Sequence, residues 1–215
     1  VACDQAGMWV PTRGLTGQAL VDELNALTSA QFCTDYSAET TFMFVTLDKD
    51  AGGMVECVYT GREVAVGADK PDATDMNTEH TWPQSQGADT FPAECDLHHL
   101  YPTDSDTNSL RGNLPFGVVV SDDGTVTGGS LRGGDASGDT VFEPRDVHKG
   151  NVARSMAYFA MRYGYTLDAD HIELFQEWGD ADPVDEVELA RTLAVGDRQG
   201  APNPYVVCPM FLDEL

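Results

Sequence analysis

Lysine is scarce in this sequence, and positive charge as a whole is in short supply. Only three of the 215 residues are lysine, and 36 Asp and Glu residues outnumber 12 Lys and Arg residues, which gives a formal net charge of −24. A surface that is so acidic resists aggregation and repels polyanions at low salt. We interpret it as a solvated surface suited to a saline habitat. The alternative is an acidic patch that binds a specific cationic partner.

The shortage of positive charge is uneven along the chain. From Thr107 to Tyr165, six basic residues balance six acidic residues, so this segment is formally neutral and the whole negative excess lies outside it. We therefore expect any face that binds an anion to lie within segment 107–165.

Three further features are missing. No apolar run approaches the roughly 20 residues that span a bilayer, so we expect a soluble protein. No C-x-x-C pair occurs, which argues against a zinc ribbon or a redox motif. The glycine-rich segment 128–138 has neither a G-K-[ST] sequence nor the strand-to-helix context of a dinucleotide-binding loop.

The cysteines indicate an exported protein. Five of them are spread along the chain, which suits one or two disulfides with at least one thiol left over. The alternative is a cytosolic protein with inert buried cysteines. The chain begins at Val1 without a methionine, as a mature form would after signal removal, although an arbitrary boundary would look the same.

The pattern of apolar residues predicts a mixed chain without internal repeats, and its length suits one α+β domain over residues 1–215. Segment 37–47 fits either a helix or a buried strand, and we favour the helix. Other helices are predicted over 15–30, 144–163, 169–178 and 184–195. Strands are predicted over 55–59, 63–66 and 118–120, a turn over 121–124, a loop over 128–138 and an extended tail over 203–209.

Segment 77–117 concentrates residues that can do chemistry. It holds three of the five histidines, and Trp82-Pro83 ends its first predicted strand, because proline cannot donate to a strand ladder. Glu79 and His80 are adjacent there. Neighbours in a regular strand point to opposite faces, so the two can share a site only where the strand ends or twists.

A second strand and a helix are expected to complete this segment. The strand is predicted over 96–101, ended by Pro102, and Thr103 or Asp104 then caps a short helix. Asn108 and Arg111 lie three residues apart and share a face of that helix.

Together these groups suit phosphodiester hydrolysis. Glu79 and Asn108 offer hard oxygen ligands, which suit Mg²⁺ or Ca²⁺ rather than zinc. A neutral His80 beside such a metal can take a proton from water, and the fork of Arg111 can hold a phosphate. The candidate catalytic residues are therefore His80 and Arg111, and the candidate metal ligands are Glu79 and Asn108.

Two of these interpretations have alternatives. Arg111 could instead form a structural pair with Asp104 or Asp106. His98 and His99 could suggest a zinc pair, but strand neighbours diverge and no third soft ligand is evident. We expect one of these two histidines to face the core and the other to form a wall of the site.

The long motif in segment 77–117 resembles the bacterial endonuclease I family of secreted or periplasmic nucleases. It reads N-x-E-H-x-W-P-x-S, then D-L-H-H-L-x-P-x-D-x-x-x-N-x-x-R-G-N-x-P-F-G. The resemblance extends to V-E-C-V-Y-T-G over 55–61, to F-E-P-R-D-V-H-K-G-N-V-A-R over 142–154 and to Q-G-A-P-N-P-Y near the end. It implies a His-Me finger (ββα-metal) core at about 77–117, with a small antiparallel sheet surrounded by helices.

The resemblance also implies roles and an activity. His80 resembles the general base that activates water, and Glu79 and Asn108 resemble the metal ligands. A backbone carbonyl near Glu94 is expected to bind the other ring nitrogen of His80. The implied protein is a secreted or periplasmic monomer that cuts DNA and RNA with little sequence preference and contacts no membrane. Its expected cofactor is Mg²⁺, with Mn²⁺ or Ca²⁺ as alternatives, and its products carry 5′-phosphate and 3′-hydroxyl ends.

The chain departs from its relatives by losing positive charge. Gln84 and Gln86 stand in a turn where relatives commonly have Lys or Arg, and Ala201-Pro202 replaces a segment that often carries an arginine. Because the Debye length falls to about 3 Å at 1 M salt, we predict a nuclease that is most active above physiological salt. The alternative function is a catalytically silent module that binds nucleic acid or cations, against which an intact His80 argues. A third interpretation is a calcium-binding loop that begins at Asp104, but the segment lacks the glycine and the closing glutamate that such a loop requires.

Overall fold

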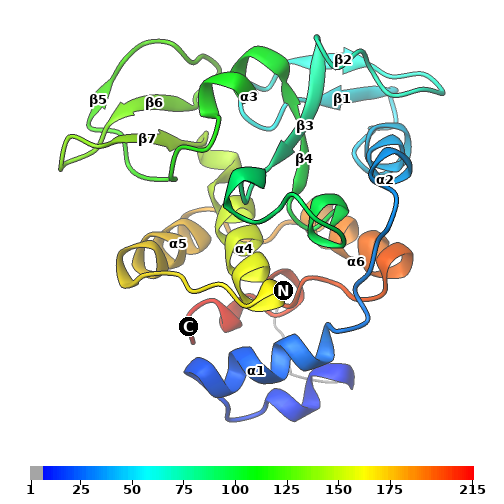
Figure 1. Cartoon of the computed structure of the whole chain (residues 1–215), viewed down its shortest axis with the longest axis vertical. Helices are drawn as coiled ribbons and strands as arrows, with labels where there is room; N and C mark the ends of the chain where they lie inside the picture. The colour runs from blue at the N-terminus through cyan, green and yellow to red at the C-terminus, as the bar shows by residue number, and fades with distance from the viewer. Residues whose placement is uncertain (1–6) are drawn as a thin grey trace.

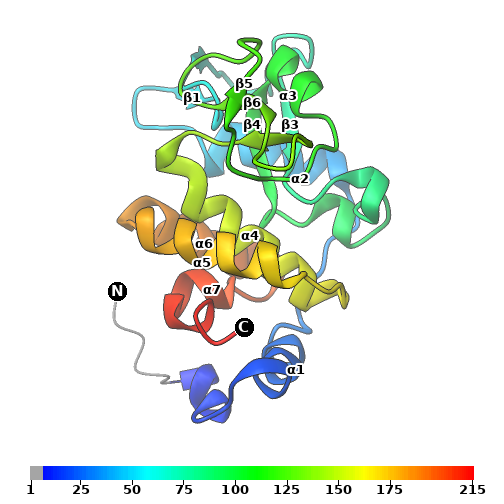
Figure 2. The ribbon, with the colours of Figure 1, turned by 90° about the vertical axis from the view of Figure 1, so that its left-hand side faces the viewer.

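The strands of the molecule gather at one end and the long helices at the other. A computed structural model describes residues 7–215. Figure 1 shows the small sheets above a layer of helices, with α1 at the far end of the long axis. Figure 2 shows the same separation after a quarter turn, with α4 and α5 lying between α1 and the strands. The chain is therefore a mixed α and β protein, as the pattern of apolar residues predicts.

The helices are mostly where the sequence predicts them. The predicted helices over 15–30, 169–178 and 184–195 are confirmed, as is the preference for a helix over a strand in segment 37–47, which continues past α2 as a π-helical turn, Met43–Leu47. The α-helices are α1 (Gly17–Leu27), α2 (Tyr36–Phe42), α3 (Ser105–Arg111), α4 (Asp146–Tyr163), α5 (Ala169–Ala181), α6 (Glu186–Gln199) and α7 (Pro204–Val207).

Three small antiparallel sheets hold all the strands of the described residues. They pair β1 (Met54–Glu56) with β2 (Glu63–Ala65), β3 (Met76–His80) with β4 (Leu100–Asp104), and β5 (Ser121–Asp122) with β6 (Leu131–Gly134) and β7 (Thr140–Glu143). In the central pair, His80 lies opposite Leu100 and Met76 opposite Asp104. Helix α3 follows β4 without a gap, so β3, β4 and α3 form a strand-strand-helix unit.

Several predicted elements are wrong. The strand expected over 118–120 is absent. Val118 and Val120 are exposed, Val120 N donates to the carbonyl oxygen of Gly134 at 2.9 Å, and the paired strand begins only at Ser121, in the expected turn. The expected glycine-rich loop contains β6. The tail expected to be extended forms α7, whose first turn is capped by Asn203, which accepts a hydrogen bond from Tyr205 N at 2.9 Å. Side-chain capping at Asn203 is a local signal that apolar periodicity does not contain.

The second strand of the central pair is shifted relative to its prediction. It begins at Leu100 and runs through Pro102, which lies opposite Thr78 instead of ending the strand. Pro102 has no N–H group to donate, and its carbonyl oxygen accepts a hydrogen bond from Val58 N at 3.0 Å. The residues from Asp96 to His99 form a turn that precedes the strand.

A disulfide and a free thiol agree with the cysteine pattern. Cys33 and Cys95 are bonded, with Cα atoms 6.0 Å apart, and Cys57 is buried and free. The expectation that a thiol is left over is therefore confirmed by Cys57, whereas Cys3 lies outside the described residues. No helix between residues 7 and 215 combines the length and the apolar character needed to cross a membrane.

Helix α4 forms the centre of the helical layer and is buried along most of its length. It begins at Asp146 and ends where Gly164 adopts a left-handed conformation, with φ of +74°. Its apolar side chains, such as Val152 and Tyr158, belong to the main core, which reaches from η1 (Gly7–Thr12) to the C-terminal residues. Burial of this face joins the strands to the helices.

Gly150 permits the closest approach between α4 and the end of α5. Gly150 N donates to Asp182 Oδ2 at 2.9 Å, and Arg154 Nη1 donates to the Asp182 carbonyl oxygen at 3.0 Å. A Cβ atom on Gly150 would lie 1.9 Å from that carbonyl oxygen and 2.6 Å from Arg154 Nη2. The helix therefore requires a residue without a side chain here.

We predict that Gly150→Ala lowers the free energy of unfolding by about 2 kcal/mol, as overpacking does in well-packed sites. Alanine normally stabilises a helix interior by about 1 kcal/mol relative to glycine, so the sign distinguishes the two effects. Urea denaturation measures the change. Gly67→Ala is the control, because a Cβ atom at Gly67 meets nothing within 4 Å. A Gly150→Ala protein as stable as the unmodified chain would contradict this account of the contact.

Candidate active site

Three of the four predicted site residues border one cleft. A cleft of about 310 Å³ is lined by Thr78, Glu79, His80, Pro83, Gln84, Ser85, Asn108, Gly112 and Asn113. It lies at the end of β3 and beside α3. Glu79 and His80 contact different groups, as strand neighbours do, and both reach the cleft because it lies where the strand ends.

A larger cavity elsewhere has less chemistry to offer. It measures about 660 Å³ and lies between the segment after α2 and helix α6. Two of its three basic side chains are already bound to carboxylates, since Arg191 binds Asp48 and Arg145 binds Glu56, and none of the four predicted site residues lines it. The smaller cleft is therefore the better candidate for a reaction.

His80 is held so that one ring nitrogen is bound and the other is free. Nε2 lies 3.0 Å from the carbonyl oxygen of Glu94, the contact expected near that residue. A carbonyl oxygen only accepts, so Nε2 carries the proton and Nδ1 has an open lone pair. Nδ1 has no hydrogen-bond partner among the described residues. It is also not one of their fully buried polar atoms without a partner, so it stays in contact with solvent. Burial lowers the pKa of His80 to about 3, so the ring is neutral at ordinary pH.

Glu79 is a buried carboxylate with two partners. Its Oε1 accepts a hydrogen bond from the Tyr59 hydroxyl at 2.8 Å and lies 3.3 Å from Arg111 Nε. Burial raises the pKa of Glu79, while Arg111 and Tyr59 act in the opposite direction. A divalent cation bound in the cleft would offset the free-energy cost of burying the Glu79 carboxylate, so Glu79 is suited to be a metal ligand.

Asn108 is oriented to present its oxygen. Its Nδ2 donates to Asn77 Oδ1 at 2.8 Å and to the Thr78 carbonyl oxygen at 3.1 Å. The amide nitrogen is thereby committed, which leaves the Oδ1 atom of this half-buried side chain available. Carbonyl and carboxylate oxygens are the ligands that Mg²⁺ and Ca²⁺ take, so Glu79 and Asn108 together fit such an ion.

Arg111 lies beneath the cleft and is not one of its lining residues. Its side chain is 1% exposed and its guanidinium lies 4.5 Å from the centre of the Phe116 ring. Nη1 and Nη2 donate to backbone carbonyl oxygens of His80, Thr81 and Gly112. The alternative of a structural pair with Asp104 or Asp106 does not hold as stated, because the carboxylate beside Arg111 is Glu79. This burial also disfavours the expected role of a phosphate clamp.

The neighbouring histidines hold structure together. His98 Nε2 lies 2.8 Å from the carbonyl oxygen of Ala201, and His99 Nε2 lies 2.7 Å from that of Ala93. His99 also meets the His80 ring edge-on, with centroids 5.6 Å apart. Both histidines are buried and neither lines the cleft, so the expectation that one of them forms a wall of the site is not met, and His99 instead supports the His80 ring from inside the core. Within residues 7–215, no group of three His, Cys, Asp or Glu side chains is placed to hold a metal ion.

The neutral segment 107–165 does not present free cations. Its basic side chains are bound to carboxylates or to backbone carbonyl oxygens, in the contacts Arg111–Glu79, Arg132–Asp123, Arg145–Glu56, Lys149–Glu143, Arg154–Glu188 and Arg162 with Ser29 and Gln31. The cleft itself is lined by no Lys or Arg. The expectation of an anion-binding face built from these cations is therefore not supported.

Several residues of the site were missed in the sequence. Tyr59 donates to Glu79, Asn77 orients Asn108, and Tyr36 stacks on the His80 ring with centroids 5.7 Å apart. Tyr59 and Asn77 lie inside motifs that carry the family resemblance, which could have identified them. Tyr36 lies outside those motifs and has no such signal.

His148 supports the site from behind Tyr59. It is 5% exposed, meets the edges of Tyr59 and Tyr101, and its Nε2 has no hydrogen-bond partner among the described residues. Burial lowers the pKa of His148 to about 3, and nearby arginines add to the effect.

Sequence comparisons relate the chain to known nucleases. Residues 17–210 match the family described as Endonuclease I. The extracellular ribonuclease of Bacillus subtilis (strain 168) is 30% identical over 224 aligned residues, which cover 94% of this chain and 75% of that protein. The extracellular ribonuclease of Bacillus amyloliquefaciens is 31% identical with the same coverage. A periplasmic deoxyribonuclease of Aeromonas hydrophila is 29% identical over 113 residues, which cover 53% of this chain and 47% of that protein.

We predict that His148→Phe flattens the dependence of stability on pH. An unfolded histidine gains a proton near pH 6.5, whereas folded His148 stays neutral down to about pH 3. Its contribution to stability is therefore full above pH 6.5 and is lost as the pH falls from 6.5 towards 3. Urea unfolding between pH 6 and pH 5 should show a slope smaller by about 1 kcal/mol per pH unit in the variant.

The comparison of slopes removes the contributions of all other titrating groups, which both proteins share. It also separates the proton effect from any uniform loss of packing. Equal slopes in the two proteins would show that His148 titrates normally when folded.

Proposed function

The chain belongs to the endonuclease I family, and on that premise we propose that it is a metal-dependent endonuclease with little sequence preference. The observation that carries the proposal is the cleft that joins a neutral imidazole, a buried carboxylate and an oriented amide oxygen. Its strand-strand-helix unit fits the His-Me finger core that the family resemblance implies. The proposed products are 5′-phosphate and 3′-hydroxyl ends.

His80 acts as the general base in this proposal. Its neutral ring offers Nδ1 to a water molecule in the cleft, while Nε2 stays bound to the carbonyl oxygen of Glu94. The proton of the water passes to Nδ1 as the water oxygen attacks the phosphorus atom, and the bond to the 3′ oxygen breaks on the opposite side. The leaving 3′ oxygen keeps the electron pair and takes a proton from solvent to give the 3′-hydroxyl end. A positioned base of this kind contributes about 10² to 10⁴-fold to a rate.

Glu79 and Asn108 would hold the metal ion, for which we propose Mg²⁺. When bound, such an ion supplies stabilisation of the charge that develops on the phosphate and on the leaving oxygen. Arg111 serves this pair from below: it lies against Glu79 and donates to the carbonyl oxygens of His80 and Thr81. In this role Arg111 fixes the end of β3 and does not bind the substrate.

RNA and DNA are both proposed substrates. The relatives that align with 94% of this chain are named ribonucleases, and those named deoxyribonucleases align with 53%. We therefore expect RNA to be cut at least as readily as DNA. Their names, extracellular and periplasmic, support a protein that acts outside the cytoplasm.

The charge of the protein points to activity at elevated salt. A net charge of −24 opposes a polyanionic substrate, and no lysine or arginine lines the cleft to offset it. Neutral side chains such as Gln84, Ser85 and Asn113 stand there instead. Salt screens the repulsion, and few counterions are released on binding because few cations contact phosphate.

We predict that His80→Ala lowers the rate of cleavage by at least about 100-fold while leaving the protein folded. Cleavage of a labelled RNA and of a supercoiled plasmid at saturating Mg²⁺ measures the rate, and thermal unfolding reports the fold. His171→Ala is the matched control, because His171 is half-buried in the first turn of α5 and does not line the cleft. A His80→Ala variant that cleaves at the wild-type rate would show that His80 is not the general base.

We predict that the wild-type rate rises with NaCl and peaks well above about 0.15 M, the physiological ionic strength. Gln84→Lys should raise the rate at low salt and move the maximum to lower salt, because it places a cation in the cleft. Gln18→Lys on α1 is the matched control, since it adds the same charge at the far end of the molecule. A wild-type rate that falls steadily from low salt would contradict the screening argument.

A further inference from the structure

The His80 ring is enclosed on three sides. Tyr36 stacks on it at a centroid distance of 5.7 Å and an interplanar angle of 19°. His99 meets it edge-on at 5.6 Å, and the carbonyl oxygen of Glu94 binds its Nε2. Because the ring is only 7% exposed, these contacts leave the Nδ1 edge as the part that reaches the cleft.

The stacking partner and the hydrogen-bond acceptor come from distant parts of the chain. Tyr36 is the first residue of α2, whereas Glu94 lies in the short 3₁₀ helix Ala93–Cys95 before β4. The Cys33–Cys95 disulfide joins these two segments. Cys33 stands just before α2, and Cys95 directly follows Glu94, so one covalent bond links both groups that hold the ring.

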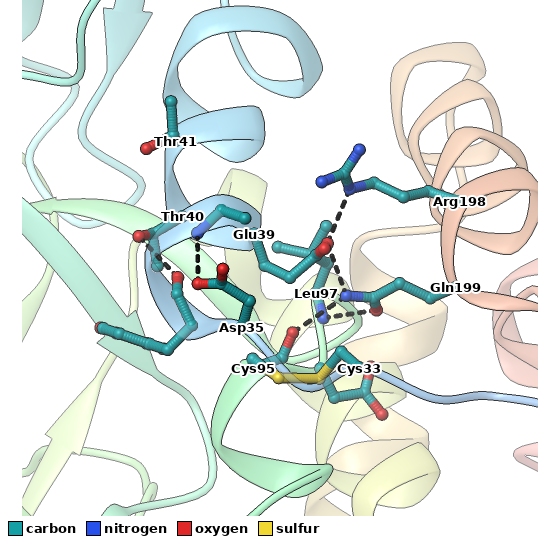
Figure 3. Close-up of polar contacts among 12 residues, drawn as sticks. Cys33, Asp35, Glu39, Thr40, Thr41, Cys95, Leu97, Arg198 and Gln199 are labelled. Carbon is teal, nitrogen blue, oxygen red and sulfur yellow. Dashed lines mark hydrogen bonds and ion pairs between the residues drawn. A yellow bond between two sulfur atoms is a disulfide. The ribbon is translucent and has the colours of Figure 1, made fainter.

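Polar contacts reinforce the same link, as Figure 3 shows. Gln199 Nε2 donates to Glu39 Oε2 of α2 at 2.8 Å and to the Cys95 carbonyl oxygen at 3.0 Å. Arg198 also donates to Glu39, at 2.7 Å, and Gln199 Oε1 accepts from Leu97 N at 3.1 Å. The end of α6 thus holds α2 and the 93–97 turn in one arrangement.

We propose that Tyr36, fixed to the Glu94 turn by the Cys33–Cys95 disulfide, is a positioning residue that sets the orientation of the His80 ring for proton transfer. Tyr36 is not among the residues that line the cleft. Its ring stacks on His80, and its hydroxyl group forms a side-chain hydrogen bond with Thr78, which does line the cleft. This inference rests on the proposed function, since it assigns a role within the same site.

The role is assigned to the stacked ring of Tyr36, and Tyr36→Phe tests the contact of its hydroxyl group with Thr78 separately. A ring stacked at this distance resists rotation of the His80 imidazole about the side-chain bonds that join it to the backbone. Aromatic pairs in this range stabilise a protein by about 0.5–1.5 kcal/mol beyond the effect of burying their surface. Small errors in the placement of a catalytic group are costly, on the order of 100-fold for about 1 Å. Loss of the ring should therefore lower kcat and leave substrate binding unchanged.

The test compares Tyr36→Phe, which keeps the ring, with Tyr36→Leu, which keeps an apolar side chain but removes the aromatic stack. Steady-state cleavage of a short defined oligonucleotide at saturating Mg²⁺ gives kcat and KM. We expect Tyr36→Leu to lower kcat by about 10 to 100-fold with KM within about twofold, and Tyr36→Phe to stay close to wild type. The double variant Cys33→Ser/Cys95→Ser should lower kcat in the same direction.

Nuclear magnetic resonance of ¹⁵N-labelled histidine supplies a readout that does not depend on cleavage. The wild-type His80 should show the single tautomer with its proton on Nε2, and Tyr36→Leu should show a mixture of tautomers or broadened signals. Phe32→Ala is the control, because Phe32 is a 63% exposed aromatic close to the disulfide.

The outcomes separate the two proposals. A wild-type protein that does not cleave, or a His80→Ala variant that does, defeats the proposed function, and the tautomer spectra then still decide the positioning role. If the wild type cleaves and His80→Ala does not, three results overturn the role of Tyr36. These are a normal kcat in Tyr36→Leu, a change confined to KM, and an equal loss in Tyr36→Phe.

Discussion

The hydrogen bond between His80 Nε2 and the carbonyl oxygen of Glu94 is the contact on which the candidate site depends. It decides which ring nitrogen carries the proton, and so which one faces the cleft. The carbonyl oxygen must itself stay in place, and the turn that contains it is bound from several directions. Asp96 Oδ2 accepts hydrogen bonds from Tyr158 and Tyr163 of α4, and Gln31 donates to Asp96 Oδ1. These contacts from α4 and Gln31 hold the turn that carries the Glu94 carbonyl oxygen next to His80.

Burial of charge on the other side of β3 has a similar purpose. Glu79 and Arg111 are each 1% exposed and lie against each other, with Tyr59 donating to the carboxylate. An isolated buried carboxylate would be costly, so this pairing allows Glu79 to line the cleft while it is almost fully buried. Arg111 therefore has a structural role next to the proposed reaction centre. In the proposed mechanism, neutral side chains and the metal ion contact the phosphate instead.

Much of this could be predicted from the sequence, and the failures have identifiable causes. Helices α1, α5 and α6 follow from apolar periodicity, and Glu79, His80 and Asn108 follow from one motif in segment 77–117. Sequence spacing placed Arg111 beside Asn108 on a helix face but could not show that the side chain turns towards Glu79, because burial depends on tertiary packing. The same limit applies to Tyr36, which meets His80 through the packing of α2 beside the Glu94 turn, where the Cys33–Cys95 disulfide joins the two segments.

The central claim is that this cleft cuts nucleic acid with a divalent metal held by Glu79 and Asn108. Digestion of supercoiled plasmid DNA with and without EDTA tests it most directly, when carried out at high NaCl with the metal restored afterwards. The account predicts nicking and linearisation that EDTA abolishes and that added Mg²⁺ restores. Cleavage that continues at full rate in EDTA would contradict it.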